Sequence, residues 1–165
     1  MPIAQTLQHF LQDARIDYQL VTHPYSERAL HTATSAQIPV SSMTKAIILN
    51  DTEGYVMAVI PSTNRLVLHW INVCMDRNLH MVREKELTHL FPDCAPGAVP
   101  AVGAAYNMTT CWDDELSYMP DIYIEGGNHI ELVQLARKYY KKLLKQQPHA
   151  AISCDPEEAM AYSNV

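Results

Sequence analysis

A lysine at the start of an apolar run is the first residue whose type and position suggest chemistry. Lys45 stands directly before Ala46-Ile47-Ile48-Leu49, a run typical of a buried strand. A lysine at the end of such a strand can project into a cleft, where its ammonium can hold a phosphate or stabilise a developing oxyanion. The alternative is a solvated lysine at a strand start, which position alone favours.

Two glycine-containing segments could bring backbone N–H groups close to a ligand. Gly97-Ala98-Val99-Pro100 is a loop of small residues, and Glu125-Gly126-Gly127-Asn128-His129 lies between an expected strand and an expected helix. Small residues let the backbone approach a ligand, and N–H groups at a helix N-terminus suit an anion or a carbonyl oxygen. His129 could exchange a proton near neutral pH. The alternatives are an ordinary connection for the first segment and a capped turn with an exposed histidine for the second.

Other polar residues give weaker indications. His23, directly before Pro24, could contact a ligand or could bond a backbone group and set the turn. Ser41 and Ser42 precede Lys45 at a spacing that allows a Ser–Lys pair, although this spacing is common. The 8 histidines and 18 acidic residues show no HExxH pattern and the 4 cysteines no CxxC pair, so we expect no metal. Nucleotide-binding glycine motifs are also missing, and we expect no cofactor.

Apolar runs and periodicity indicate the elements that must position these residues. The strands 46–49 and 55–60 are apolar on both faces and are joined by turn-forming residues 50–54, so we expect a hairpin at the centre of a covered sheet. Weaker strand patterns lie at 17–22, 79–82, 109–112 and 121–124. Helical patterns mark 3–14, 32–38, 66–73 and 84–91, and residues 93–107 are expected to form a structured loop.

A further helix is predicted from residue 128 onward. Asn128 can cap it, with Glu131 at the capping-box position. Its buried stripe would consist of Leu132, Leu135, Ala136, Tyr139 and Leu143. Residues 146–153 are typical of a linker, and Asp155-Pro156 opens another short helix. The mixture of hairpins and helices predicts an α+β fold, with one domain over 1–144 and a linker and short helix over 145–165.

Composition limits the class of protein. The 165 residues favour a single domain, and the formal net charge of −6 with a pI near 5.7 excludes a basic protein that holds a polynucleotide by bulk charge. A small local site for nucleic acid stays possible. No apolar run approaches the roughly 18 residues that span a bilayer, and residues 1–5 lack the basic start of a signal peptide. Scattered cysteines favour a reducing compartment, so we expect a cytoplasmic protein with no membrane partner.

Several segments, taken in order, resemble the family of YbaK and the prolyl-tRNA synthetase editing domain, which are aminoacyl-tRNA deacylases. The resemblance covers about residues 17–144, and its specificity lies in the ordered set rather than in any one segment. The matching segments are Thr22–Tyr25, Leu30–Ala33, Thr44–Leu49, Gly54–Pro61, Glu84–Leu87, Leu90–Cys94, Gly97–Pro100, Ala105-Tyr106 and Tyr123–His129.

The resemblance implies a compact α+β domain with a mixed, barrel-like sheet flanked by helices. Members of the family hydrolyse the ester between a wrong amino acid and the 3′ end of a tRNA, without a metal or a covalent nucleophile. The family's key lysine falls on Lys45, its Gly/Pro loop on 97–100 and its glycine–His turn on 127–129. The expected catalytic residues are Lys45, Gly97 and His129. The expected substrate-binding residues are His23, Ala98, Val99, Pro100, Gly126, Gly127 and Asn128.

The expected activity is therefore trans-editing: hydrolysis of a tRNA mischarged with a small amino acid. The acidic charge suits a protein that grips only the acceptor 3′ end, with Lys45 neutralising phosphates locally. An aminoacyl-tRNA synthetase is a further candidate partner, and the sequence leaves the oligomeric state open.

Two departures from the family pattern motivate an alternative. Many relatives have a second proline where this chain has Ala101 and a glycine where it has Asn107, although asparagine tolerates a positive φ. The alternative is a non-catalytic module that binds an aminoacyl-tRNA end, a nucleotide or an amino-acid conjugate. A serine hydrolase that pairs Ser41 or Ser42 with Lys45 is a third possibility.

Overall fold

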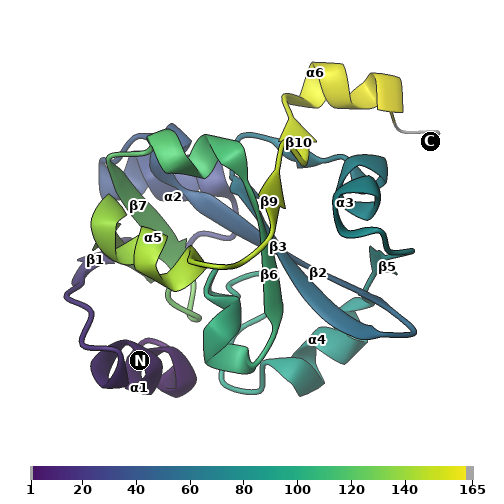
Figure 1. Cartoon of the computed structure of the whole chain (residues 1–165). Coiled ribbons are helices and arrows are strands. Elements are labelled where there is room, and N and C mark those ends of the chain that lie inside the picture. The colour runs from purple at the N-terminus through teal and green to yellow at the C-terminus, as the bar shows by residue number, and fades with distance from the viewer. Residues whose placement is uncertain (1, 163–165) are drawn as a thin grey trace.

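The computed structural model describes residues 2–162 of the chain, and Figure 1 shows the order of the elements. The strands are β1 (Gln19–Thr22), β2 (Thr44–Asp51), β3 (Gly54–Pro61), β4 (Arg65–Leu66), β5 (His80–Met81), β6 (Thr109–Asp113), β7 (Asp121–Glu125), β8 (Glu131–Ala136), β9 (His149–Ala150) and β10 (Ser153–Cys154). The α-helices are α1 (Gln5–Asp13), α2 (Ala29–Ala36), α3 (Leu68–Met75), α4 (Glu84–Leu90), α5 (Arg137–Leu144) and α6 (Pro156–Ala159).

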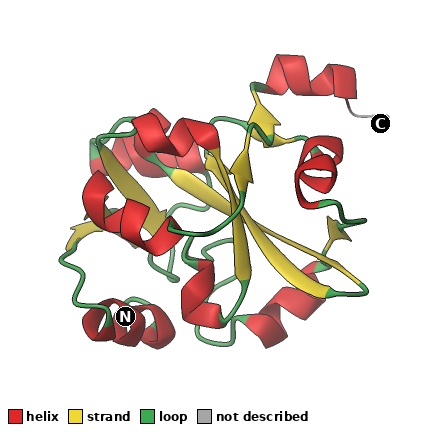
Figure 2. Ribbon diagram, in the orientation of Figure 1, coloured by secondary structure: helices red, strands yellow, loops and turns green. Residues whose placement is uncertain are grey.

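The strands form a mixed arrangement, as the sequence predicts. A sheet in the order β5-β2-β3-β6-β9 pairs its first three strands antiparallel and its last three parallel. A second sheet, β1-β8-β7, is antiparallel, and β4 pairs with β10 alone. Helices lie outside the strands (Figure 2), which confirms a single α+β domain. The described strands close no barrel, so the barrel-like expectation holds only in that the sheet is mixed.

The β2–β3 hairpin lies at the centre of the larger sheet, as expected. Its pairing runs without interruption from Thr44 opposite Pro61 to Asp51 opposite Gly54. In β3, Met57 and Val59 face one apolar cluster, while Val56, Ala58 and Ile60 face another. A strand buried on both faces has apolar residues at every position, and this is why its sequence pattern is continuous rather than alternating.

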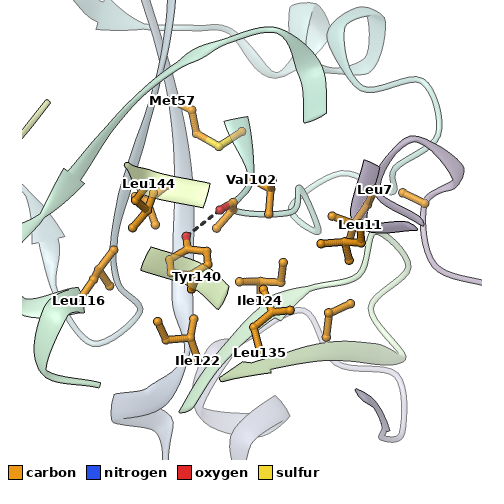
Figure 3. Packing of buried hydrophobic residues seen from close by; sticks show 14 of the residues in the cluster. Leu7, Leu11, Met57, Val102, Leu116, Ile122, Ile124, Leu135, Tyr140 and Leu144 are labelled. Carbon is orange, nitrogen blue, oxygen red and sulfur yellow. Dashed lines mark hydrogen bonds between the residues drawn. The ribbon is translucent and has the colours of Figure 1, made fainter. Parts of the chain in front are cut away.

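The larger core cluster joins both sheets and reaches the N-terminal helix. Figure 3 shows side chains from α1, β3, β7, β8 and α5 meeting around Tyr140. The buried hydroxyl of Tyr140 donates a 2.7 Å hydrogen bond to the carbonyl of Ala101. A buried tyrosine normally needs such a partner for its hydroxyl. This bond ties the loop that precedes β6 to the core.

The helix predicted from residue 128 is wrong over its first half. Residues 131–136 form the strand β8, which pairs with β1 on one side and β7 on the other, and the helix begins only at Arg137. Asn128 Oδ1 does accept the N–H groups of Ile130 and Glu131, at 3.1 and 3.0 Å. These are the hydrogen bonds of a cap, but they close a hairpin turn, since asparagine forms the same bonds in turns.

The C-terminal segment differs from the expected linker. Within 146–154, β9 lies beside β6 and β10 pairs with β4. The buried Asp113 carboxylate accepts hydrogen bonds from the N–H groups of Ile152 and Ser153 and from the Ser153 hydroxyl. The short helix that follows is as predicted, with Asp155 as its cap. No helix within residues 2–162 is long and apolar enough to cross a bilayer.

Candidate active site

One cavity brings together parts of the chain that the sequence predicts for the site. It has a volume of about 290 Å³ and opens between the start of β2, the β5–α4 segment, the 97–99 loop and the end of β7. The residues that decide its chemistry are Lys45, Glu84, Leu87, Gly97, Val99 and Glu125. Concave sites with a largely apolar wall and a few polar groups are typical of small-ligand binding.

A link between the two sheets places Lys45 beside Glu125. Met43 and Tyr123 form a parallel bridge, and Thr44 Oγ1 donates a 3.3 Å hydrogen bond to the carbonyl of Tyr123. Side chains two residues apart on a strand leave on the same side. Counting two residues along each strand from the bridge leads to Lys45 and to Glu125, so both charged groups reach the same cavity.

Lys45 offers a free cation at the rim of this cavity. The residue stays exposed to solvent while lining the cavity wall. Among residues 2–162 no carboxylate pairs with its ammonium. Partial burial, and then repulsion from Arg65, lower the pKa of Lys45 from its ordinary value. An unpaired ammonium at a cavity mouth can hold an anion.

Glu125, near the same bridge on β7, has a carboxyl oxygen without a hydrogen-bond partner within residues 2–162. The residue is partly buried, and its Oε2 atom is shielded from solvent with no hydrogen-bond partner in the described residues. Burial raises the pKa of Glu125 to about 7, although nearby His129 acts in the opposite direction. No ion pair joins Glu125 to Lys45. The cavity therefore holds a lysine and a glutamate that form no ion pair with each other.

The 97–99 loop supplies a backbone wall. Gly97 has a φ of +80°, a backbone conformation that residues with a Cβ rarely adopt. Ala98 N–H turns back to the carbonyl of Ala95 at 3.1 Å, whereas the N–H groups of Gly97 and Val99 donate to no described residue. Free N–H groups beside a cavity are suited to a carbonyl oxygen or an anion.

The turn between β7 and β8 holds this loop from behind. Ala95 N–H donates to the carbonyl of Gly127 at 2.8 Å, and His129 Nε2 donates to the carbonyl of Pro96 at 2.6 Å. A carbonyl can only accept, so His129 carries its proton on Nε2. A Cβ on Gly97 would lie 3.5 Å from Cε1 of the same ring. The turn thus fixes the position of the 97–99 loop relative to the cavity.

His129 itself is not in the helix turn that the sequence predicts. It has a φ of 61° in the hairpin turn and is 2% exposed. Its ring packs against that of Tyr25 in a T-shaped arrangement, with 5.4 Å between ring centroids, and it does not line the cavity. The structure therefore places this residue one layer behind the site.

His23 is also buried behind the site. Its Nδ1 donates a 2.7 Å hydrogen bond to the carbonyl of Pro24, and its backbone N–H donates to Ile130. These contacts are those of the turn-setting alternative. His23 does not line the cavity either.

The glycine pair faces the N-terminal segment. A Cβ on Gly126 would lie 2.9 Å from Ile3 Cγ2, and one on Gly127 would lie 2.9 Å from the Cβ of Ala4. The carbonyl of Gly126 accepts the N–H of Ala4 at 2.8 Å, and Asn128 Nδ2 donates to the carbonyl of Pro2. These three residues pack the chain's start against the turn, outside the cavity.

The other residues of the predicted loop are largely buried. The two departures from the family pattern, Ala101 and Asn107, both fit the local structure. Ala98 and Pro100 are buried and do not line the cavity, whereas Val99 does. Ala101 is 1% exposed, and its carbonyl is held by Tyr140. Asn107 adopts a φ of 57°, as expected for a residue that replaces glycine in this conformation.

The predicted serines do not share the cavity. Ser41 is exposed and Ser42 is buried, and neither lines the wall that holds Lys45. The serine that does line it, Ser62, donates its hydroxyl to the carbonyl of Val40 at 3.1 Å. Within residues 2–162, no three histidine, cysteine, aspartate or glutamate side chains come together as a metal site would require.

A smaller hollow of about 120 Å³ adjoins the main cavity. The two share Glu84, Leu87, Gly97 and Val99, and the hollow continues to Phe91. Cys94 is also in its wall, and burial raises the pKa of this thiol to about 12. The hollow is therefore a largely apolar annex with a neutral thiol.

Glu125 is the site residue that sequence reasoning missed. In the sequence it stands at the start of the segment 125–129, whose glycines and histidine are the residue types more often associated with binding and proton transfer. The signal that could have found it is the one that identified Lys45, a charged residue at the end of an apolar strand.

Comparison with protein families and solved structures agrees with this architecture. The aminoacyl-tRNA editing domain family matches residues 23–143. No curated protein sequence matches the chain.

Solved structures share the fold at low identity. A hypothetical protein has a TM-score of 0.80 at 18% identity, with 91% of this chain and 100% of that chain covered. A candidate trans-editing enzyme for prolyl-tRNA synthetase has a TM-score of 0.78 at 22% identity, with 93% and 98% covered. A candidate signal transduction protein from Marinobacter aquaeolei VT8 has a TM-score of 0.75 at 16% identity, and there the match spans 91% of this chain and 30% of the other. These likenesses concern the fold.

Proposed function

This chain belongs to the aminoacyl-tRNA editing domain family, and we propose that it is a trans-editing deacylase that hydrolyses the ester of a tRNA mischarged with a small amino acid. The observation that carries the proposal is a single cavity lined by Lys45, by the 97–99 loop and by Glu125. These groups come from three separate parts of the chain. Their convergence is what a binding site for one small ligand requires.

Hydrolysis of an aminoacyl ester needs only modest catalytic help from the protein. An aminoacyl ester is already reactive, so the protein must hold the ester, admit water and stabilise the negative charge that develops on the carbonyl oxygen. The free N–H groups of Gly97 and Val99 are suitable donors for that oxygen. The ammonium of Lys45, at the rim, suits a phosphate of the acceptor end.

His129, His23 and the glycine pair act as positioning residues in this proposal. His129 holds the Pro96 carbonyl, and the turn holds Ala95, so together they fix the loop that carries the N–H donors. A loop shifted by about 1 Å can cost on the order of 100-fold in rate, because the donors no longer meet the reacting oxygen. The role of these residues is therefore to preserve geometry.

The apolar annex supports a small amino acid as the substrate. Its volume of about 120 Å³, between α4 and the loop, has room for a short side chain. Exclusion by size is effective, whereas rejection of a smaller side chain is worth only about 1–3 kcal/mol per methylene. The likeness to a candidate trans-editing enzyme for prolyl-tRNA synthetase makes that synthetase a reasonable partner to test.

A panel of mischarged tRNAs tests the proposal. We expect the wild-type protein to hydrolyse one or more tRNAs carrying Ala, Cys, Ser, Thr or Pro. Lys45→Ala should lower kcat/KM by about tenfold or more, the effect of losing a charged hydrogen bond to a phosphate. Lys142→Ala, which removes an exposed lysine of α5, is the matched control. Equal hydrolysis by wild type and Lys45→Ala would contradict the mechanism. Binding of a non-hydrolysable aminoacyl-adenosine with no turnover of any tRNA would instead support a binding module.

A further inference from the structure

The proposed function gives no role to the carboxyl group of Glu125, which lines the cavity. Its Oε2 atom is buried and has no hydrogen-bond partner among the described residues. Buried polar atoms in folded proteins are nearly always paired, and an unpaired carboxyl oxygen destabilises the empty protein. Such an atom in the wall of a cavity indicates that a ligand supplies the missing partner.

No side chain in the described part of the chain meets this requirement. Lys45 reaches the same cavity but forms no ion pair with Glu125. His129 is close enough to influence the carboxyl electrostatically, but its Nε2 proton is held by the Pro96 carbonyl, and its Nδ1 forms no hydrogen bond. The partner that Glu125 lacks is therefore a donor or a cation from outside.

We propose that Glu125 binds the α-ammonium group of the aminoacyl ester, and that the site therefore selects esters with a free α-amino group over N-acylated ones. This inference rests on the proposed function and names its substrate class more closely. An α-ammonium offers three N–H donors and a positive charge, which a carboxylate accepts in a strong, charge-assisted hydrogen bond.

The placement of the two charged groups also sets the orientation of the substrate. Lys45 and Glu125 lie two residues beyond the same bridge on neighbouring strands, so they face the cavity together. An aminoacylated tRNA end carries a cation on the amino acid and anions on its phosphates. With the ammonium at Glu125, the phosphate side points toward Lys45, and the reverse orientation would bring like charges together.

Other titratable groups around the cavity do not replace Glu125. Glu84 of α4 and Glu27, ahead of α2, also line it, but both are exposed to solvent. Glu27 also accepts a 2.8 Å hydrogen bond from the hydroxyl of Tyr25. Burial raises the pKa of Glu125 to about 7, so a bound ammonium would favour the charged form that burial disfavours. Binding of free-amine esters should weaken as the pH falls below about 7.

Paired substrates test the inference. One mischarged tRNA that the wild type hydrolyses is compared with the same tRNA after N-acetylation, which keeps the ester and removes the positive charge. We expect the wild type to prefer the free amine, and Glu125→Gln to raise KM for the free-amine substrate by about tenfold or more, the effect of losing a charged hydrogen bond. The variant should leave the N-acetylated substrate unchanged. Asp121→Asn, at the other end of the same strand, is the control.

Each alternative outcome has a separate meaning. An equal loss of kcat on both substrates would overturn the inference, because it is the result expected of a general base. Unchanged kinetics of Glu125→Gln would overturn it as well. A wild-type protein that hydrolyses no mischarged tRNA would instead contradict the proposed function. Calorimetric binding of a non-hydrolysable aminoacyl-adenosine amide and its N-acetyl form then still tests Glu125 directly, since only the free-amine form should lose affinity in the variant.

Discussion

Two antiparallel hairpins each contribute a charged residue to the cavity, and they do so in different ways. The β2–β3 hairpin contributes Lys45 from the beginning of its first strand, and its turn lies at the other end of that strand. The β7–β8 hairpin contributes Glu125 from the last residue of its first strand, directly before its turn. The first turn holds Arg77, which does not line the cavity, whereas the second turn supports the loop of the site.

The turn glycines show the same difference. Gly54 in the first turn has a φ of +128° with nothing within 4 Å of an added Cβ, whereas Gly127 in the second has a φ of +103° with Ala4 in the way. The comparison indicates that the turn of the β2–β3 hairpin has no part in the candidate site, whereas the turn of the β7–β8 hairpin both closes its strands and supports the site. Changes to the second turn should therefore affect both stability and activity.

The largest expected effect comes from replacing each of these two glycines with alanine. Gly54→Ala should cost about 1–2 kcal/mol of unfolding free energy, from the backbone strain alone. Gly127→Ala should cost about 1–3 kcal/mol more, because the new methyl group also overpacks against Ala4. Chemical denaturation measures both values, and deacylation should fall only in Gly127→Ala. Equal losses in the two variants would remove the distinction between the turns.

A smaller effect should come from the other end of the supported loop. Tyr140→Phe leaves the Ala101 carbonyl without its buried donor and should cost about 1–3 kcal/mol of unfolding free energy. Tyr139→Phe is the matched control, because the Tyr139 hydroxyl bonds Asp17 at the surface and should cost well under 1 kcal/mol. Denaturation of the two variants side by side gives the comparison. Equal losses of unfolding free energy in the two variants would mean that the buried Tyr140 hydrogen bond stabilises the protein no more than the surface one does.

The smallest effect is a difference in pH response between the hairpins. Burial raises the pKa of Glu125 from 4.5 to about 7, so the folded state holds this proton more tightly and loses stability as the pH rises from 4.5 to 7. Asp51, in the first turn, has its pKa lowered by hydrogen bonds from Arg77, so its contribution is present above 3.8 and is lost as the pH falls below that value. The two carboxyls therefore change the stability of the fold in opposite directions as the pH rises.

Thermal unfolding of two variants checks this difference. Glu125→Gln should raise the Tm relative to wild type at pH 8 and change it less at pH 5. Asp51→Asn should lower the Tm at pH 7, with the deficit shrinking below about pH 4. A Glu125→Gln difference that is the same at both pH values would mean that the carboxyl titrates as an ordinary exposed group.

The two hairpins also differ in how well sequence predicts them. The β2–β3 hairpin follows from a local signal, two apolar runs around a turn, and Lys45 at its edge follows with it. The β7–β8 hairpin does not, because Leu132 and Leu135 have helical spacing and Asn128 has the sequence of a cap. Pairing with β1, more than a hundred residues earlier in the chain, decides the strand, and local patterns carry no information about such a partner.

The candidate site shows the same limit. Lys45, Gly97 and Val99 could be predicted, and the structure brings them to one cavity. His129 and His23 could be selected by type, but their burial behind the cavity depends on contacts with Pro96 and Pro24 that no spacing reveals. Glu125 acquires its importance from a missing partner, and only the packed structure shows that an atom has none.

The location of a bound substrate analogue is the most direct test of the central claim, that the two hairpins build one site. A crystal structure with a non-hydrolysable aminoacyl-adenosine amide should place its ammonium at Glu125, its carbonyl oxygen near the N–H groups of Gly97 and Val99, and its nucleoside toward Lys45. A second cavity, of about 410 Å³ and lined by Trp112 and Tyr140, contains none of the predicted site residues. An analogue bound there, with the Lys45 cavity empty, would contradict the account.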